Sequence, residues 1–140
     1  MGWLSSANWF SPHWCDRLVN VYLAVAFGSA VGGLVRFLLS TAFADRLPWP
    51  TLLINIAGST IIGLAFALTA ADGRFPLNST YRALIMPGFC GGFTTFSTFS
   101  AEAMFLWKDS HPKAILYVLA SVFLSLLGVW AGHTLGEKYN

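Results

Sequence analysis

One stretch in the middle of the chain decides the fold, and it reads Gly88-Phe89-Cys90-Gly91-Gly92-Phe93-Thr94-Thr95-Phe96-Ser97-Thr98-Phe99-Ser100. It places three glycines and five hydroxyl residues inside a long apolar segment, where they make helix propensity poor. A membrane helix tolerates a break only where the freed backbone is buried in protein or lines a cavity. The stretch therefore predicts a helix broken near the bilayer midplane. The alternative is a glycine kink used for packing, with hydroxyls bonded back to the preceding turn.

The composition around this stretch is that of an integral membrane protein. The chain has 140 residues, of which 56% are hydrophobic and only 10% charged, whereas a soluble domain carries about a quarter charged residues. Eight basic and six acidic residues leave a net charge of +2, which is too small for a surface that tracks nucleic acid. The two cysteines form no disulfide framework, and no spacing of Cys and His resembles a metal site.

Four apolar segments account for most of the chain, at residues 18–43, 51–71, 83–107 and 114–136. Each exceeds the length of about 20 residues that a helix needs to cross the hydrocarbon core. We therefore expect an all-α membrane protein with four transmembrane helices, the third of them broken. The domain organisation follows: a Trp-rich interfacial N-terminal extension at 1–17, the transmembrane domain at 18–136 and a C-terminal tail at 137–140.

Lysine and arginine are almost evenly divided between the two sides of the membrane. With four spans, one side carries Arg17, Arg74, Arg82 and Lys138, and the other carries Arg46, Lys108 and Lys113, joined by Arg36 if it reaches that interface. Membrane proteins are oriented by an asymmetry in these residues. The balance favours either insertion in both orientations, which permits an antiparallel dimer, or an orientation set by a very small imbalance.

Small residues at four-residue spacing predict close helix packing. Gly28 and Gly32 have this spacing in the first span, and Gly128, Gly132 and Gly136 repeat it in the fourth. Such residues let helix backbones approach one another in lipid. The packing they support lies either within one subunit or between subunits.

Polar residues also recur every fourth position on two spans. Thr51, Asn55 and Ser59 share one face of the second span, and Tyr117, Ser121 and Ser125 share one face of the fourth. Asn55 offers two amide hydrogens, which an anion needs when it sheds water. Together with the hydroxyls of the third span, these tracks predict a continuous hydrophilic route, although each alone is compatible with interhelical hydrogen bonding.

Phe96 and Phe99 sit three residues apart among these hydroxyls and so share a helical face. A phenyl ring has a partly positive edge, which can approach a small hard anion. Of the Asp, Glu, Lys and Arg residues, Arg36 and Glu102 are the two within the spans, and such residues are functional candidates. Arg36 either attracts anions at a pore mouth or snorkels to the surface, and Glu102 either sits in a vestibule or caps a helix.

On these residues the chain resembles the Fluc (CrcB) fluoride channels, small bacterial membrane proteins of four helices. The resemblance covers roughly residues 18–136 and is anchored by the stretch from Gly88 to Ser100. Asn55 and Gly58 in the second span agree with it, as do Gly32-Gly33 and Arg36 in the first. Pro50 departs from it, since glycine is expected before Thr51.

The resemblance implies an antiparallel dual-topology homodimer with two fluoride pores, each built from both subunits. It assigns the fluoride pore to Phe96, Phe99, Asn55, Ser97, Thr98, Ser100, Tyr117, Ser121 and Ser125. It also implies that the backbone carbonyls of Gly91 and Thr94, two per subunit, hold a structural Na+ at the dimer axis. Arg36 and Glu102 are its vestibule candidates.

We therefore expect a passive channel in the bacterial inner membrane that exports fluoride and relieves its toxicity. The sequence contains no nucleophile–base constellation, phosphate loop or cofactor fingerprint, so no enzyme activity is expected. The main alternative is a small dual-topology, proton-coupled transporter of drugs or cations. That chemistry requires acidic residues deep in the membrane, and Glu102 is the one candidate. A structural subunit of a larger complex is a third possibility.

Overall fold

The computed structural model describes residues 12–43, 49–70 and 72–140, and within these ranges every regular element is helical. The predicted all-α class is therefore confirmed for the described residues. The interfacial position predicted for the N-terminal extension falls largely on residues 1–11, which lie outside them. The described part of that extension belongs to the first helix, which begins at Pro12.

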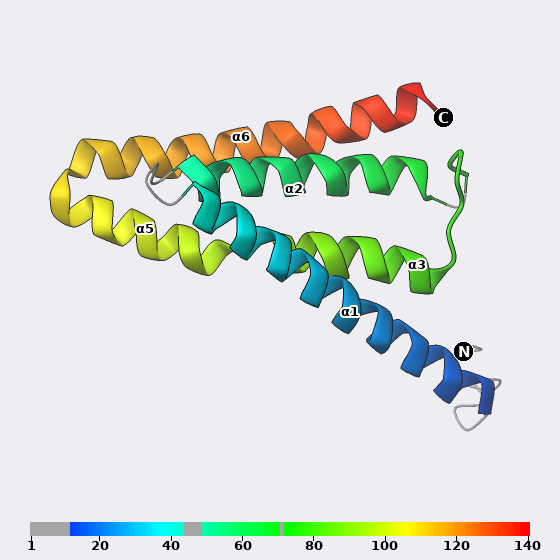
Figure 1. The fold of residues 1–140 in the computed structure, drawn as a ribbon. Coiled ribbons are helices and arrows are strands. Elements are labelled where there is room, and N and C mark those ends of the chain that lie inside the picture. Colours follow the sequence, from blue (N-terminus) through cyan, green and yellow to red (C-terminus); the bar gives the residue numbers. More distant parts are fainter. Residues whose placement is uncertain (1–11, 44–48, 71) are drawn as a thin grey trace, which may run out of the picture.

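The described helices form four rods, which Figure 1 shows side by side or crossing at an angle. The first two rods are the uninterrupted helices α1 (Pro12–Ala42) and α2 (Trp49–Leu68), and α6 (His111–Lys138) is the last. The third rod consists of four successive segments, α3 (Ser79–Ala83), η2 (Leu84–Cys90), α4 (Gly91–Phe93) and α5 (Phe96–Asp109). Pro50 lies in the first turn of α2, where the missing N–H of proline has no helical partner to lose.

Three of the rods contain a helix long and apolar enough to cross a membrane, at Leu18–Ala42, Pro50–Leu68 and His111–Lys138. These agree with the first, second and fourth predicted spans to within a few residues. The third predicted span, residues 83–107, is not one continuous helix. The described chain is thus a multi-pass membrane protein by the length and composition of these helices.

The segment η2 is a π-helix, which the sequence analysis did not predict. Pro87 lies inside it, and a proline removes one backbone donor and displaces the preceding turn. Wider π turns accommodate such a residue and are frequent near functional sites. The hydroxyl of Ser29 on α1 donates to the carbonyl of Gly88 at 3.3 Å, which supplies a partner at this irregular turn.

Three pairings hold the rods together. α2 packs along α6, and α1 packs against η2 and α4, while α5 lies on the first part of α6. The predicted small-residue packing is confirmed within the chain, because a side chain at Gly28 or Gly32 would collide with the backbone of η2. A side chain at Gly132 would likewise collide with the backbone of α2 at Thr60.

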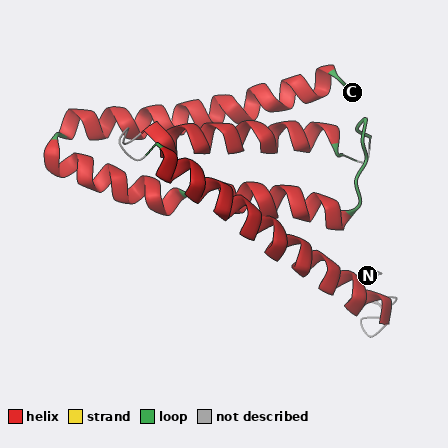
Figure 2. Ribbon diagram, in the orientation of Figure 1, coloured by secondary structure: helices red, strands yellow, loops and turns green. Residues whose placement is uncertain are grey.

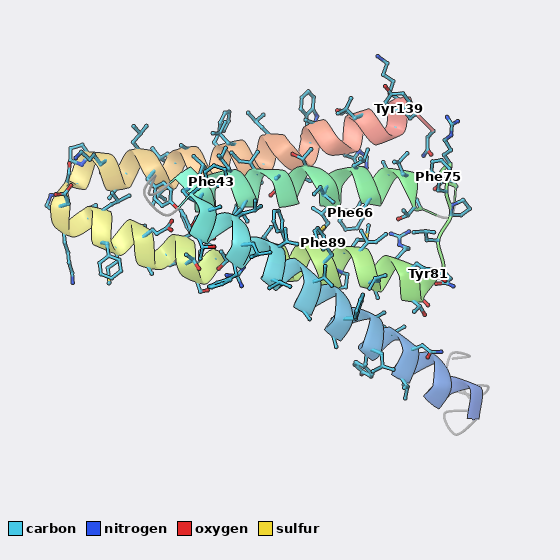
Figure 3. All side chains as sticks on the ribbon, viewed as in Figure 1. Phe43, Phe66, Phe75, Tyr81, Phe89 and Tyr139 are labelled. Carbon is cyan, nitrogen blue, oxygen red and sulfur yellow. The ribbon has the colours of Figure 1, made fainter. Side chains whose placement is uncertain are left out.

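The outer surface of the chain is apolar, as a lipid or subunit contact requires. Large side chains such as Leu23 and Phe27 on α1, and Phe123 and Trp130 on α6, are exposed. Figure 2 shows the loops at the ends of the rods and at the short gap between α4 and α5. Phe75, Tyr81 and Tyr139 lie at one end of the molecule (Figure 3), where aromatic rings suit a membrane–water interface.

Candidate functional site

The site centres on Thr94 and Thr95, which separate α4 from α5. Both residues have extended backbone conformations, with φ −80° and ψ 155° at Thr94 and φ −148° and ψ 116° at Thr95. Helical hydrogen bonds cannot cross such a segment, so carbonyls at the end of α4 and amides at the start of α5 lose their usual partners. The interruption therefore presents acceptors and donors to the space around it.

The side chain of Asn55 on α2 is hydrogen-bonded to both backbone groups of Thr95. Its Oδ1 accepts from the Thr95 amide at 2.9 Å, and its Nδ2 donates to the Thr95 carbonyl at 3.2 Å. One of the two amide hydrogens of Asn55 is used in this way, and the other remains for a further acceptor. Asn55 thus fixes the extended conformation from a neighbouring helix.

Other groups at the interruption have partners of their own. Nε of Arg36 on α1 donates to the carbonyl of Gly92 at 3.2 Å. The amide and the hydroxyl of Thr94 both donate to the carbonyl of Cys90 at 2.9 Å. The Thr95 hydroxyl accepts from the Thr98 amide at 3.2 Å and so caps α5.

Backbone carbonyls are the ligands that hard cations such as Na+ take from unwound membrane helices. The amide of Thr95, which would donate to the Gly91 carbonyl in a continuous helix, is bound to Asn55 instead. The amide of Thr98, four residues after Thr94, is bound to the Thr95 hydroxyl. The carbonyls of Gly91 and Thr94 are therefore deprived of their helical donors, and the two residues fit a cation.

A cavity of about 480 Å³ opens beside the interruption, between α2, η2, α4, α5 and α6. It brings together seven of the predicted site residues, namely Asn55, Gly91, Thr94, Phe96, Phe99, Ser121 and Ser125. Ser121 is buried, and its hydroxyl has no hydrogen-bond partner within the described residues. The Ser121 hydroxyl is enclosed by protein atoms, so it belongs to the wall of the cavity.

The two phenyl rings differ sharply in exposure. Phe99 is 7% exposed, whereas Phe96 is 78% exposed, although their ring centroids are only 5.4 Å apart and the planes are inclined by 52°. The ring of Phe99 also packs against that of Tyr117, with centroids 5.5 Å apart. Phe99 therefore belongs to the core at the edge of the cavity, and Phe96 extends from it to the outside of the single chain.

Glu102 is held by hydroxyl groups from two other helices. The Thr51 hydroxyl on α2 donates to Oε1 at 2.7 Å, and the Tyr117 hydroxyl on α6 donates to Oε2 at 2.6 Å. Both donors are buried, and the carboxylate is partly buried. This network fastens α5 to α2 and α6 one turn beyond Phe99, and charge-assisted bonds of this kind are among the strongest in proteins.

The remaining predicted residues lie away from the cavity lining. Ser97 and Ser100 are exposed, and the Ser100 hydroxyl donates to the Phe96 carbonyl at 2.8 Å. Thr98 is bound to Thr95 through both its amide and its hydroxyl.

Two further predicted residues bind partners outside the cavity. The Tyr117 hydroxyl donates to Glu102, and Nε of Arg36 donates to the Gly92 carbonyl. Their assignment to a pore or a vestibule stays a prediction.

Sequence reasoning missed several residues of this site. Met86, Pro87 and Cys90 line the cavity from the π-helix, and Thr51 binds Glu102. Pro87, in the middle of an apolar run, was a signal of an irregular turn, because proline inside a helix is a recognised cause of distortion. Nothing in the sequence indicated that Asn55 would bind the backbone of Thr95.

Comparison with known sequences places the chain among small membrane proteins. The sequence model of one family, described as "CrcB-like protein, Camphor Resistance (CrcB)", matches residues 23–133. That range takes in α2, α3, η2, α4 and α5 in full and most of α1 and α6.

Several relatives are similar over nearly their whole length. A protein of Paramagnetospirillum magneticum named fluoride-specific ion channel FluC is 49% identical over 124 residues, which cover 85% of this chain and 97% of the relative. FluC 1 of Bradyrhizobium diazoefficiens is 42% identical over 127 residues, or 89% of both chains. FluC of Methylobacterium radiotolerans is 43% identical over 122 residues, covering 84% of this chain and 85% of the relative.

Proposed function

The chain belongs to the CrcB family, and from this premise we propose that it is a fluoride-selective ion channel. The named relatives are ion channels rather than enzymes. The observation that carries the proposal in the structure is the cavity that joins Asn55, Phe96, Phe99 and Ser121 beside the interruption. These groups supply the contacts that a small anion needs in exchange for water.

Fluoride holds its water strongly, so a selective passage has to replace that water with closely spaced donors. Asn55, Ser121 and Ser125 line the same cavity, and their amide and hydroxyl groups are donors of this kind. The first amides of α5 are a further source of positive potential, because a helix carries about half a positive charge at its N-terminus. The donors supply the anion's hydrogen bonds, and the helix end favours its charge.

The phenyl rings add contacts of a different kind. The edges of Phe96 and Phe99 carry partial positive charge, and their tilted arrangement turns them away from mutual face-to-face stacking. A ring edge binds an anion without offering a strong hydrogen bond, so the ion is not trapped. In the proposed pore these rings line the narrow part of the route, and Tyr117 supports Phe99 from behind.

We assign the carbonyls of Gly91 and Thr94 to a structural Na+, because their helical donors are engaged elsewhere. A bound cation would supply a fixed positive charge next to the anion route. Within the chain, Arg36 binds the carbonyl of Gly92, between Gly91 and Thr94, and Asn55 binds the backbone of Thr95, which follows them. The hydroxyl of Thr95 caps the helix that follows them.

The chain is further proposed to act as an antiparallel, dual-topology homodimer with two pores. The 78% exposure of Phe96, next to a cavity that is open on the single chain, supports a second copy that completes the wall. The nearly even distribution of Lys and Arg between the two sides supports insertion in both orientations. The bacterial inner membrane is the proposed location, where a passive exit for fluoride would protect the cell.

Fluoride efflux from liposomes that contain only this protein tests the channel. We expect efflux to follow the fluoride gradient when a potassium ionophore balances charge, without need of a pH gradient. Phe96→Ala removes an exposed ring beside the cavity and is expected to reduce efflux strongly. Asn55→Asp replaces a donor with a group that repels anions and is expected to do the same.

Phe123→Ala is the matched control, because Phe123 is also an exposed ring but lies on the apolar surface of α6 away from the cavity. Its efflux should equal that of the unmodified protein. Absence of fluoride efflux from the unmodified protein would contradict the channel. Normal efflux in both pore variants would contradict the assignment of the pore to this cavity.

A further inference from the structure

We propose that Asn55 is a positioning residue for the cation as well as a contact for the anion. Its carbonyl oxygen, by holding the Thr95 amide, keeps the Gly91 carbonyl free for Na+. This inference rests on the cation site of the proposed function and adds a link between that site and the anion route. One amide side chain then serves both ions, with its oxygen on the cation side and its nitrogen on the anion side.

The first step is the competition for the Thr95 amide. In an uninterrupted α-helix this amide would donate to the carbonyl four residues earlier, which is that of Gly91. Oδ1 of Asn55 accepts it instead at 2.9 Å. A carbonyl that accepts no amide keeps its full negative potential, and a carbonyl engaged in a helical bond is a poorer ligand.

The second step is that the neighbouring carbonyls are already engaged. The Cys90 carbonyl accepts from the amide and the hydroxyl of Thr94, and the Gly92 carbonyl accepts from Arg36. No side chain within the described residues donates to the Gly91 carbonyl. Thr94 in the same rod and Arg36 on α1 thus occupy the neighbouring carbonyls, and Asn55 is the residue on which the Gly91 carbonyl depends.

The third step separates the two ends of the Asn55 amide. Nδ2 donates to the Thr95 carbonyl at 3.2 Å and keeps a second hydrogen, whereas Oδ1 accepts from the Thr95 amide. Asn55 also lines the cavity. An aspartate keeps the oxygen acceptor and loses the donors. A leucine of similar volume loses both, so the two substitutions distinguish the role of the oxygen from that of the nitrogen.

The experiment measures Na+ affinity in the purified full-length protein, independently of transport. Thermal unfolding in detergent is followed as Na+ replaces a large organic cation, and the midpoint shift yields an apparent affinity. Asn55→Leu is expected to weaken Na+ binding about tenfold, because a backbone hydrogen bond at Gly91 now competes with the cation. Asn55→Asp is expected to bind Na+ as tightly as the unmodified protein or more tightly, although it loses fluoride efflux.

Thr60→Val is the matched control on the same helix. Its hydroxyl donates to the Ile56 carbonyl and does not reach the interruption, so Na+ affinity should be unchanged. Equal Na+ affinity in Asn55→Leu and the unmodified protein would overturn the inference, as would a loss of affinity in Asn55→Asp equal to that in Asn55→Leu. A protein that conducts fluoride but shows no Na+ dependence would overturn it too, and would leave the channel standing.

Discussion

The pair α2–α6 and the interrupted rod from α3 to α5 both bring glycines close to a neighbouring backbone, but only the rod has a break in its own helix beside them. In the pair, Gly63 and Gly132 bring two continuous helices into backbone contact, and every turn keeps its own hydrogen bonds. In the rod, Gly92 also packs on the α1 backbone at Ser29, but the helix ends soon after it at the extended Thr94 and Thr95. Side chains of other helices bind the backbone there, Arg36 at the Gly92 carbonyl and Asn55 at the Thr95 amide. The first region is a scaffold, and the second depends on that scaffold.

The comparison shows that glycine content alone does not locate a functional break in a membrane helix. What separates the two regions is the source of the partners for the backbone. Asn55 and Arg36 come from α2 and α1, so the interruption is stable only when those helices are in place. Mutations in the scaffold should therefore cost more stability than mutations at the interruption.

The largest effect is expected for Gly132→Ala. The added methyl group would meet the Thr60 carbonyl and the Leu64 amide, which are backbone atoms that cannot move alone, and such overpacking costs about 3 kcal/mol. Gly33→Ala is the control, since the nearest atom to its new methyl group lies 3.9 Å away. Thermal unfolding in detergent measures both, and equal midpoints would contradict the scaffold role of the pair.

The next largest effect is expected for Arg36→Met at the interruption. It leaves the Gly92 carbonyl without its charged donor, and bonds to charged groups contribute about 2 kcal/mol. Hydrogen exchange should speed up at the end of α4 while exchange in α6 stays slow. Uniform acceleration in both helices would argue that Arg36 supports the whole bundle and not the interruption.

A smaller loss is expected for Tyr117→Phe, which removes one of the two hydroxyls bound to Glu102. The cost should be about 1.5 kcal/mol, because the carboxylate keeps its bond to Thr51. The double variant with Thr51→Val should lose more than the sum of the single losses, since both donors serve one carboxylate. Unfolding measurements on all four proteins test this, and strict additivity would contradict a shared network.

The smallest effect is expected for Thr95→Val, which removes the cap of α5. Loss of the bond to the Thr98 amide should cost about 1 kcal/mol, and Thr95→Ser should restore most of it because serine is an equally good cap. The two variants are compared by thermal unfolding. A serine variant as unstable as the valine variant would show that the methyl group, and not the hydroxyl, matters.

Much of the architecture follows from the sequence, since apolar length alone identifies three of the membrane-spanning helices. The family resemblance is confirmed by the comparisons. The four-residue spacing of Asn55 and Ser59, and of Ser121 and Ser125, also gives the two tracks that meet in the cavity. Periodicity was sufficient there because a regular helix places such residues on one face.

The remaining features depend on contacts that no local pattern encodes. The bonds of Asn55 to Thr95 and of Arg36 to Gly92 join residues far apart in the chain. Thr51 lies on the same face of α2 as Asn55, one turn earlier. It binds Glu102 because α5 lies beside that turn of α2. Which residues share a face is thus predictable, and which neighbour each one binds is not.

The pairing of α2 with α6 has a consequence for synthesis in the cell. The last residue of α6 is made about 70 residues after the last residue of α2. At bacterial translation speeds that interval is roughly 4–14 s. During it, the groove of α2 that later receives Gly132 faces lipid or an insertion factor. Ribosome-bound intermediates should therefore hold α2 in the bilayer without α6, with only the smaller contacts to α1 and η2 in place.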